Sequence, residues 1–176
     1  AAWKAGNEKE VAARADPSAV WTGSALVVWG GWYLGPMYQV YVLANGGRYA
    51  PASDTWEVIP SSLPGTPAGR FGHATVWTGS RMIVWGGNAV GGLSGTGGVY
   101  DPSGPGPGSW TAPRASGAPE PRANPAAAWT GSEMIVWGGQ YDYYWTFDDG
   151  RRYDPSANIW KPMTDAPLSR YGHTAV

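Results

Sequence analysis

The chain has 176 residues, enough for one ordinary domain with a substantial core but short for two. Its 12 basic residues nearly balance its 13 acidic ones, and charged residues make up only 14%, which argues against a nucleic-acid partner or an anionic membrane surface. There is no cysteine, which excludes disulfides and a cysteine nucleophile, and no apolar run approaches the roughly 18 residues of a membrane span.

Glycine, proline and tryptophan are frequent, with 27, 16 and 12 residues, and they recur with a period. Each repeat carries the tetrad WTGS, then WGG, then a tyrosine two residues before a proline, and a closing tryptophan. The tetrad begins at Trp21, Trp77 and Trp129. A period of about 50 residues is typical of a repeat architecture, so the glycine and proline content does not indicate disorder.

An arginine opens each repeat, at Arg14, Arg70, Arg122 and Arg170. The chain therefore divides into three full units, which span residues 14–69, 70–121 and 122–169. Residues 1–13, with Trp3, are interpreted as the closing strand of a preceding unit, and residues 170–176 as the first strand of a following one.

Each unit predicts four short strands. The first ends at VWTG or AWTG, and a tight turn of Thr, Gly and Ser separates it from the second, LVVWGG or MIVWGG. The second is continuously apolar and rich in β-branched residues, as expected for a strand covered on both faces. The third ends at a proline, in GRYAP, GVYDP or RRYDP, and the fourth lies at the closing tryptophan.

These motifs resemble those of a kelch-repeat β-propeller, and their exact residues resemble those of bacterial kelch-motif proteins. The double glycine of that family occurs three times, beginning at Gly30, Gly86 and Gly138. The resemblance covers nearly the whole chain and implies an all-β fold of four-stranded antiparallel blades. One departure concerns the histidine after the arginine, which only two repeats carry, at His73 and His173. We interpret it as a packing residue at a strand start.

Three blades and two orphan strands predict an open or incomplete propeller, because propellers typically close with four to eight blades. One interpretation is a segment of a longer propeller. The other is a half-propeller that covers its apolar blade faces by pairing with another copy or with a different chain.

Aromatic residues outside the repeat positions gather in the segments between the double glycine and the third strand of units one and three. Strand parity places these variable loops on one face of the disc, where binding sites commonly lie on rigid scaffolds. We expect them to bind a protein or a carbohydrate; packing along the rim between blades is the alternative. The residues concerned are Trp32, Tyr33, Tyr38, Tyr41, Tyr141, Tyr143, Tyr144, Trp145 and Phe147.

The four repeated arginines enter from the same face, near the propeller axis, and two roles are open for them. They could hold a carboxylate or another anion, or they could bond to backbone carbonyls between blades. Asp142, Asp148 and Asp149 do not follow a known calcium-loop spacing, so we expect a solvated acidic loop and no metal.

The sequence favours a non-catalytic recognition or assembly module that needs no cofactor. No Ser, His and Asp set is visible, and copper radical oxidases of similar fold need a cysteine that is absent here. The alternatives are a structural subunit that docks on a larger complex through exposed blade edges, and a fragment of a carbohydrate-acting propeller enzyme. The start of the chain resembles no signal peptide, but the resemblance of the motifs to bacterial kelch-motif proteins favours a periplasmic or secreted protein.

Overall fold

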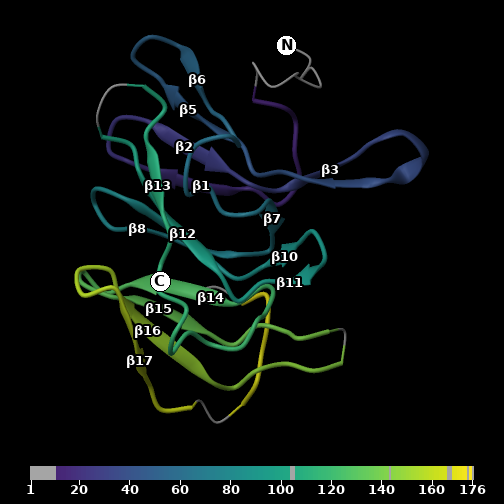
Figure 1. Cartoon of the computed structure of the whole chain (residues 1–176), viewed down its shortest axis with the longest axis vertical. Coiled ribbons are helices and arrows are strands. Elements are labelled where there is room, and N and C mark those ends of the chain that lie inside the picture. The colour runs from purple at the N-terminus through teal and green to yellow at the C-terminus, as the bar shows by residue number, and fades with distance from the viewer. Residues whose placement is uncertain (1–10, 104–105, 143, 166–167, 174, 176) are drawn as a thin grey trace.

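The computed structural model describes residues 11–103, 106–142, 144–165, 168–173 and 175. Three four-stranded antiparallel sheets follow one another along the long axis of the molecule (Figure 1). The described part is all-β apart from a single turn of 3-10 helix, η1 (Pro36–Tyr38). In the described residues there is no helix that is long and apolar enough to cross a membrane.

Each sheet is one blade, and its strands are paired in chain order. Blade 1 contains β1 (Ser18–Trp21), β2 (Leu26–Trp29), β5 (Gly46–Ala50) and β6 (Thr55–Ile59). Blade 2 contains β8 (Ala74–Trp77), β9 (Met82–Trp85), β12 (Gly97–Asp101) and β13 (Ser109–Thr111). Blade 3 contains β14 (Ala126–Trp129), β15 (Met134–Trp137), β16 (Gly150–Asp154) and β17 (Ile159–Pro162). The predicted all-β fold of antiparallel four-stranded blades is confirmed.

Two smaller sheets lie outside the blades, on the right in Figure 1. One is the hairpin of β3 (Trp32–Leu34) and β4 (Val40–Val42), which follows β2. The other joins β7 (Arg70–Phe71) to β10 (Asn88–Ala89) and β11 (Gly92–Leu93), in the order β11-β10-β7. Because β7 belongs to the connection that enters blade 2 and β10 follows its second strand, these two connections lie on the same side. We call this side the loop face.

The opposite side, the turn face, is made by short turns. In the first WTGS turn, the backbone N–H of Thr22 donates to Ala25 O at 2.9 Å, and Thr22 Oγ1 accepts from Ala25 N at 2.9 Å. Gly23 has a φ of 100°, a conformation that costs glycine little. The same bonds form at Thr78 and Thr130, so the repeated tetrad is explained by turn chemistry.

The core lies between the blades, because the facing sides of neighbouring blades are largely apolar. Val27 and Trp29 of blade 1 pack with Met82, Val84, Tyr100 and Trp110 of blade 2. The opposite face of blade 2, with Ile83 and Trp85, packs with Met134, Val136, Tyr153 and Trp160 of blade 3. Strand β9 is therefore buried at all four residues, as predicted for a second strand.

The second strands of the outer blades are fully buried on one face only. β2 and β15 each alternate between buried and half-buried residues. The closing tryptophans show the same difference: Trp110 and Trp160 are 4% and 8% exposed, whereas Trp56 of blade 1 is 41% exposed. Beyond the other end, Trp137 of blade 3 meets the ring of His173 at 4.5 Å between centroids.

The predicted terminal strands are only partly within the described residues. Trp3 and most of segment 1–13 lie outside them. In segment 170–176 the described residues form no strand. Arg170 O accepts a hydrogen bond from Gly139 N at 2.9 Å, which places this segment against blade 3.

Candidate functional site

The β3–β4 hairpin is the most prominent feature of the loop face, because it projects away from the blades (Figure 1). The rings of Tyr33 and Tyr41 stack across the hairpin at 5.1 Å with an interplanar angle of 12°. At its tip Met37 and Tyr38 are 92% and 87% exposed. Leu34 is also exposed, and no charged residue occurs between residues 30 and 47.

The tip of this hairpin has an unusual backbone. Met37 and Tyr38 have φ values of 58° and 61°, in the left-handed region that large side chains seldom adopt. Such strain is stored where the surrounding structure imposes it, and functional sites are a common location. Here it turns two large apolar side chains toward solvent.

Trp32, at the base of the hairpin, has structural contacts. Its Nε1 donates to Asp16 Oδ2 at 2.8 Å, and Ala15 exchanges backbone hydrogen bonds with it at 2.8 and 2.9 Å. Its ring lies 6.1 Å from the ring of Phe71, which enters blade 2. Trp32 thus anchors the hairpin, and the sequence had not singled out Phe71 as its partner.

The blade 3 loop presents the other expected aromatic residues. Asp142 Oδ1 accepts from the backbone N–H groups of Tyr144 and Trp145, at 2.8 and 2.9 Å, which holds the loop in a turn. Tyr141, Tyr144 and Trp145 are exposed. Phe147 is half-buried, and its ring centroid lies 3.9 Å from Cζ of Arg122, so it packs on the scaffold. Tyr143 lies outside the described residues.

A groove separates this loop from the short glycine-rich hairpin of blade 2. It has a volume of about 620 Å³ and is lined by Asn88, Gly91 and Gly92 on one side and by Gln140, Tyr141 and Asp142 on the other. The aromatic loops of blades 1 and 3 lie on the same side of the molecule, with β10 and β11 between them (Figure 1). The groove thus runs beside one of the two aromatic loops.

Three of the four repeated arginines, Arg14, Arg70 and Arg122, bond to the backbone of their own blade. Nη1 donates to the carbonyl of the first glycine of WGG, at 3.1, 3.0 and 3.0 Å for the pairs Arg14–Gly30, Arg70–Gly86 and Arg122–Gly138. Arg70 also donates to Thr96 O at 2.6 Å and Thr96 Oγ1 at 3.1 Å. Arg122 pairs with Asp149 Oδ1 at 2.7 Å.

Burial limits what these guanidinium groups can bind. Arg70 and Arg122 have no exposed surface, and burial lowers the pKa of Arg70 to about 10. Their contacts are with the chain itself, within one blade, whereas Arg170 is exposed and lies 5.5 Å from the ring centroid of Trp137. Anion binding at the arginines stays a prediction.

The WGG segments and the repeated arginines also form backbone hydrogen bonds between neighbouring repeats. The second glycine of WGG donates its N–H to the carbonyl of the next repeated arginine along the chain, at 2.8, 2.8 and 2.9 Å for the pairs Gly31–Arg70, Gly87–Arg122 and Gly139–Arg170. A Cβ atom on Gly31 would lie 2.5 Å from Ala15 O, and its φ is 88°. Only glycine fits here without strain, which explains the double glycine.

His73 joins blades 1 and 2 near the inner strands. Its Nε2 bonds to Ser18 Oγ, which in turn lies 2.7 Å from Thr75 Oγ1. Its ring meets Trp29 edge-on at 5.4 Å. Removal from water, with a smaller effect of the Arg70 charge, lowers the pKa of His73 to about 3. These contacts are those of an interface residue. Among the described residues no cluster of His, Cys, Asp and Glu could hold a metal ion.

Comparison with known proteins agrees with these features. A search of curated proteins finds no match to the chain. The family model described as the KLHDC2/KLHL20/DRC7 kelch-repeats domain matches residues 4–176, nearly the whole length. The repeated arginine, double glycine, tyrosine and tryptophan build the three blades of the region that it matches. The chain therefore belongs to the kelch-repeat family.

Proposed function

We propose that the chain is a non-catalytic recognition module that binds a protein partner through its loop face. Kelch-repeat domains generally mediate protein interaction. The carrying observation is the β3–β4 hairpin, which exposes Leu34, Met37 and Tyr38 on a segment without charged residues. Soluble proteins keep exposed apolar patches small unless the patch binds something, so this surface indicates a binding site.

The hairpin has the properties of an anchor for a protein partner. Large aromatic side chains dominate the energetics of protein interfaces, especially when they are held rigidly before binding. The stacked pair Tyr33 and Tyr41 stiffens the stem of the hairpin, so the backbone that carries the tip loses little entropy on binding. We expect Met37 and Tyr38 to enter an apolar cleft of the partner.

The blade 3 loop would supply a second contact area. Tyr141 and Trp145 are exposed on a turn that Asp142 fixes, and Tyr141 lines the groove beside β11. An interface that includes both loops would have apolar anchors at its two ends and polar groups, such as Asn88 and Gln140, between them.

A structural role is the second candidate function, and it rests on the outer blade faces. Trp21 and Trp56 are 53% and 41% exposed on blade 1. On blade 3, Ile135 and Trp137 line a hollow of about 440 Å³. These surfaces repeat the pattern by which blades pack on each other, so a subunit could dock on an edge instead of on the loop face. A bacterial origin and an extracytoplasmic location stay expectations from the sequence.

Affinity capture with paired variants tests the proposal. The chain and the double variant Tyr38→Ser/Trp145→Ser are immobilised and exposed to extract from the native source, and bound proteins are compared by quantitative mass spectrometry. We expect at least one partner to be captured by the parent chain and lost by the loop variant, because both substituted side chains are exposed and bear on no core contact.

Two further measurements decide the outcome. Circular dichroism and thermal melting must show the loop variant to be folded like the parent chain. A matched edge variant, Trp21→Ser/Trp56→Ser, should capture the same partner as the parent chain. If the edge variant loses the partner and the loop variant keeps it, the loop-face proposal is wrong and the edge-docking role is favoured.

A further inference from the structure

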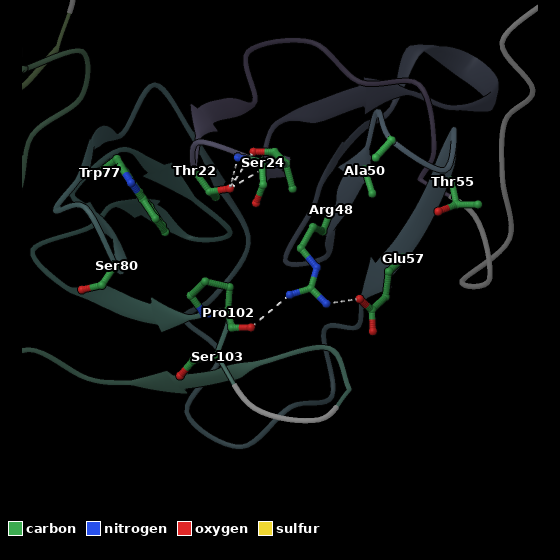
Figure 2. Close-up of a pocket in the computed structure, with 12 residues that line it drawn as sticks. Thr22, Ser24, Arg48, Ala50, Thr55, Glu57, Trp77, Ser80, Pro102 and Ser103 are labelled. Carbon is green, nitrogen blue, oxygen red and sulfur yellow. Dashed lines mark hydrogen bonds and ion pairs between the residues drawn. The ribbon is translucent and has the colours of Figure 1, made fainter.

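The turn face carries an open cleft between blades 1 and 2, opposite to the proposed protein-binding face. Its volume is about 680 Å³, within the range of small-molecule sites. Figure 2 shows its construction: Thr22 and Ser80 come from the WTGS turns of the two blades, Arg48 and Glu57 from β5 and β6, and Pro102 from the end of β12.

Two alanines contribute to the size of the cleft. The equivalent cleft between blades 2 and 3 has a volume of only about 290 Å³. There, Arg81 and Asp101 form an ion pair with 2.9 Å between Nε and Oδ2, and Arg81 lines the cleft. The strand registers place Ala25 and Ala50 at the corresponding positions of blade 1. Small side chains therefore leave open the space that an ion pair occupies in the next blade.

The floor of the cleft is polar where its counterpart is apolar. Arg48 and Glu57 are paired across β5 and β6, and they form an ion pair. The corresponding residues of blade 2 are Val99 and Thr111, and Val99 is buried. Arg48 Nη1 also donates to Pro102 O of blade 2 at 3.0 Å. A charged pair at a blade interface gains little stability over apolar residues of similar size, so its presence there needs another reason.

The chemistry of the walls indicates the ligand. Ser24 and Ser80 bring hydroxyl groups, and the indole of Trp77 lies along one wall (Figure 2). The ion pair has no net charge, but it offers donors on Arg48 and acceptors on Glu57 side by side. A guanidinium has five N–H donors, and the two bonds described leave donors over. We propose that this cleft binds a neutral saccharide.

A sugar ring matches each of these features. Its hydroxyl groups both donate and accept, so one hydroxyl can accept from Arg48 while the same or a neighbouring one donates to Glu57. Its C–H face can pack on the indole of Trp77, which has an apolar body and a polar edge. Anionic ligands such as phosphates fit less well, because Glu57 cancels the charge of Arg48.

Titration with neutral disaccharides tests this site. Maltose, cellobiose, lactose and N,N′-diacetylchitobiose are each added at millimolar concentration to the chain, and tryptophan indole N–H resonances are followed by NMR. We expect saturable binding of at least one of them, with the shift of the Trp77 resonance assigned by a Trp77→Phe variant.

Blade 2 suggests a variant that should close the cleft of blade 1. Ala25→Arg/Ala50→Asp copies the Arg81–Asp101 pair of blade 2 into blade 1, and should weaken saccharide binding by about tenfold or more. Glu57→Gln keeps the size of the side chain and removes the charge, and should also weaken binding. Tyr38→Ser, on the loop face, should leave the saccharide affinity unchanged, which separates this site from the protein-binding site.

Three results would overturn the proposal. One is the absence of saturable binding by all four disaccharides. Another is equal affinity of the parent chain and a folded Ala25→Arg/Ala50→Asp variant. The third is binding of a capped neutral tripeptide, acetyl-Gly-Ser-Gly-amide, at the Trp77 resonance in place of any sugar, which would make the cleft a peptide site.

Discussion

Lowering the pH should weaken the contact between blades 1 and 2 through the single side chain of His73. The ring bonds to Ser18 and packs on Trp29, and removal from water together with the Arg70 charge lowers its pKa from 6.5 to about 3. The folded chain therefore keeps His73 neutral in a pH range where the unfolded chain protonates it. Stability from this histidine is fully present above the unfolded pKa and is lost as the pH falls toward the folded pKa.

The size of the effect follows from the two pKa values. Between about pH 6.5 and about pH 4.5, protonation of the unfolded chain at this residue costs about 2.3 kcal/mol of unfolding free energy in all, because the unfolded ring is already half protonated at about pH 6.5. His73 is half-buried as a residue, so this value is an upper bound. We expect a loss of about 1 to 2.3 kcal/mol from this residue over that interval.

Urea unfolding of the parent chain and of His73→Gln at several pH values measures this loss. Glutamine keeps a polar group beside Ser18 but does not titrate in this range. Asp101, Glu133 and Asp154 have pKa values lowered chiefly by hydrogen bonds from Ser103 or Lys161, so they also lose stability in acid, but equally in both proteins. If both proteins lose the same free energy between these pH values, His73 is not held neutral by the interface.

Three other changes test the scaffold and the hairpin. Gly31→Ala should destabilise the chain by about 3 kcal/mol, because its Cβ would meet Ala15 O at 2.5 Å, whereas Gly79→Ala, with φ of 95° and open space, should cost only about 1 kcal/mol in urea unfolding. Arg122→Met should cost about 3 kcal/mol, because it removes the donor to Gly138 O and the shorter of the two ion pairs of Asp149; a loss below about 1 kcal/mol would contradict the role given to the guanidinium. Tyr38→Gly should raise the free energy of unfolding by about 1 kcal/mol, because glycine adopts a φ of 61° without strain, and a lower melting temperature would argue against strain at the tip.

The repeat made the blades predictable from the sequence. WTGS is a turn in which Thr22 holds the backbone, and WGG is the end of a buried strand, so both motifs mark strand boundaries within a residue or two. The residue before each histidine or proline of the first strand, Gly72 or Asp16 for example, has a positive φ. Glycine, aspartate and asparagine tolerate this conformation, so even the departures from the repeat follow a physical rule.

The loop face was predictable only in part. The sequence located the extra aromatic residues, but it could not distinguish those that point to solvent, such as Tyr38, from those that anchor the scaffold. Trp32 bonds to Asp16, and Phe147 lies on Arg122; both partners are close in space because of strand pairing, which composition does not reveal. The hairpin character of the segment from Trp32 to Val42 was likewise not predicted.

The turn-face cleft could be predicted from the sequence only by comparing the repeats, because none of its residues is unusual in itself. Its openness comes in part from what is missing at Ala25 and Ala50, and two alanines attract no attention until they are compared with Arg81 and Asp101 in the next blade. Comparing repeats position by position would have found this difference. The same comparison of repeats would have shown that Arg48 and Glu57 of blade 1 stand where blade 2 has Val99 and Thr111.

Repetition itself indicates where recognition should occur. Residues that occupy the same position in every blade, such as Arg70 and Arg122, donate to backbone carbonyls of their own blade and have no exposed surface to offer a ligand, although Nη2 of Arg122 is buried without a hydrogen-bond partner. A residue that occurs in one blade only is not needed for the contacts that every blade repeats. The three clearest departures from the repeat all have solvent-accessible side chains: the uncharged hairpin, the blade 3 loop and the Arg48–Glu57 pair on the cleft floor. The loop-face surface thus uses positions outside the repeat, whereas the turn-face cleft combines the blade-specific Arg48 and Glu57 with repeat residues such as Trp77, so substitutions at Arg48 or Glu57 should leave the repeated turns intact.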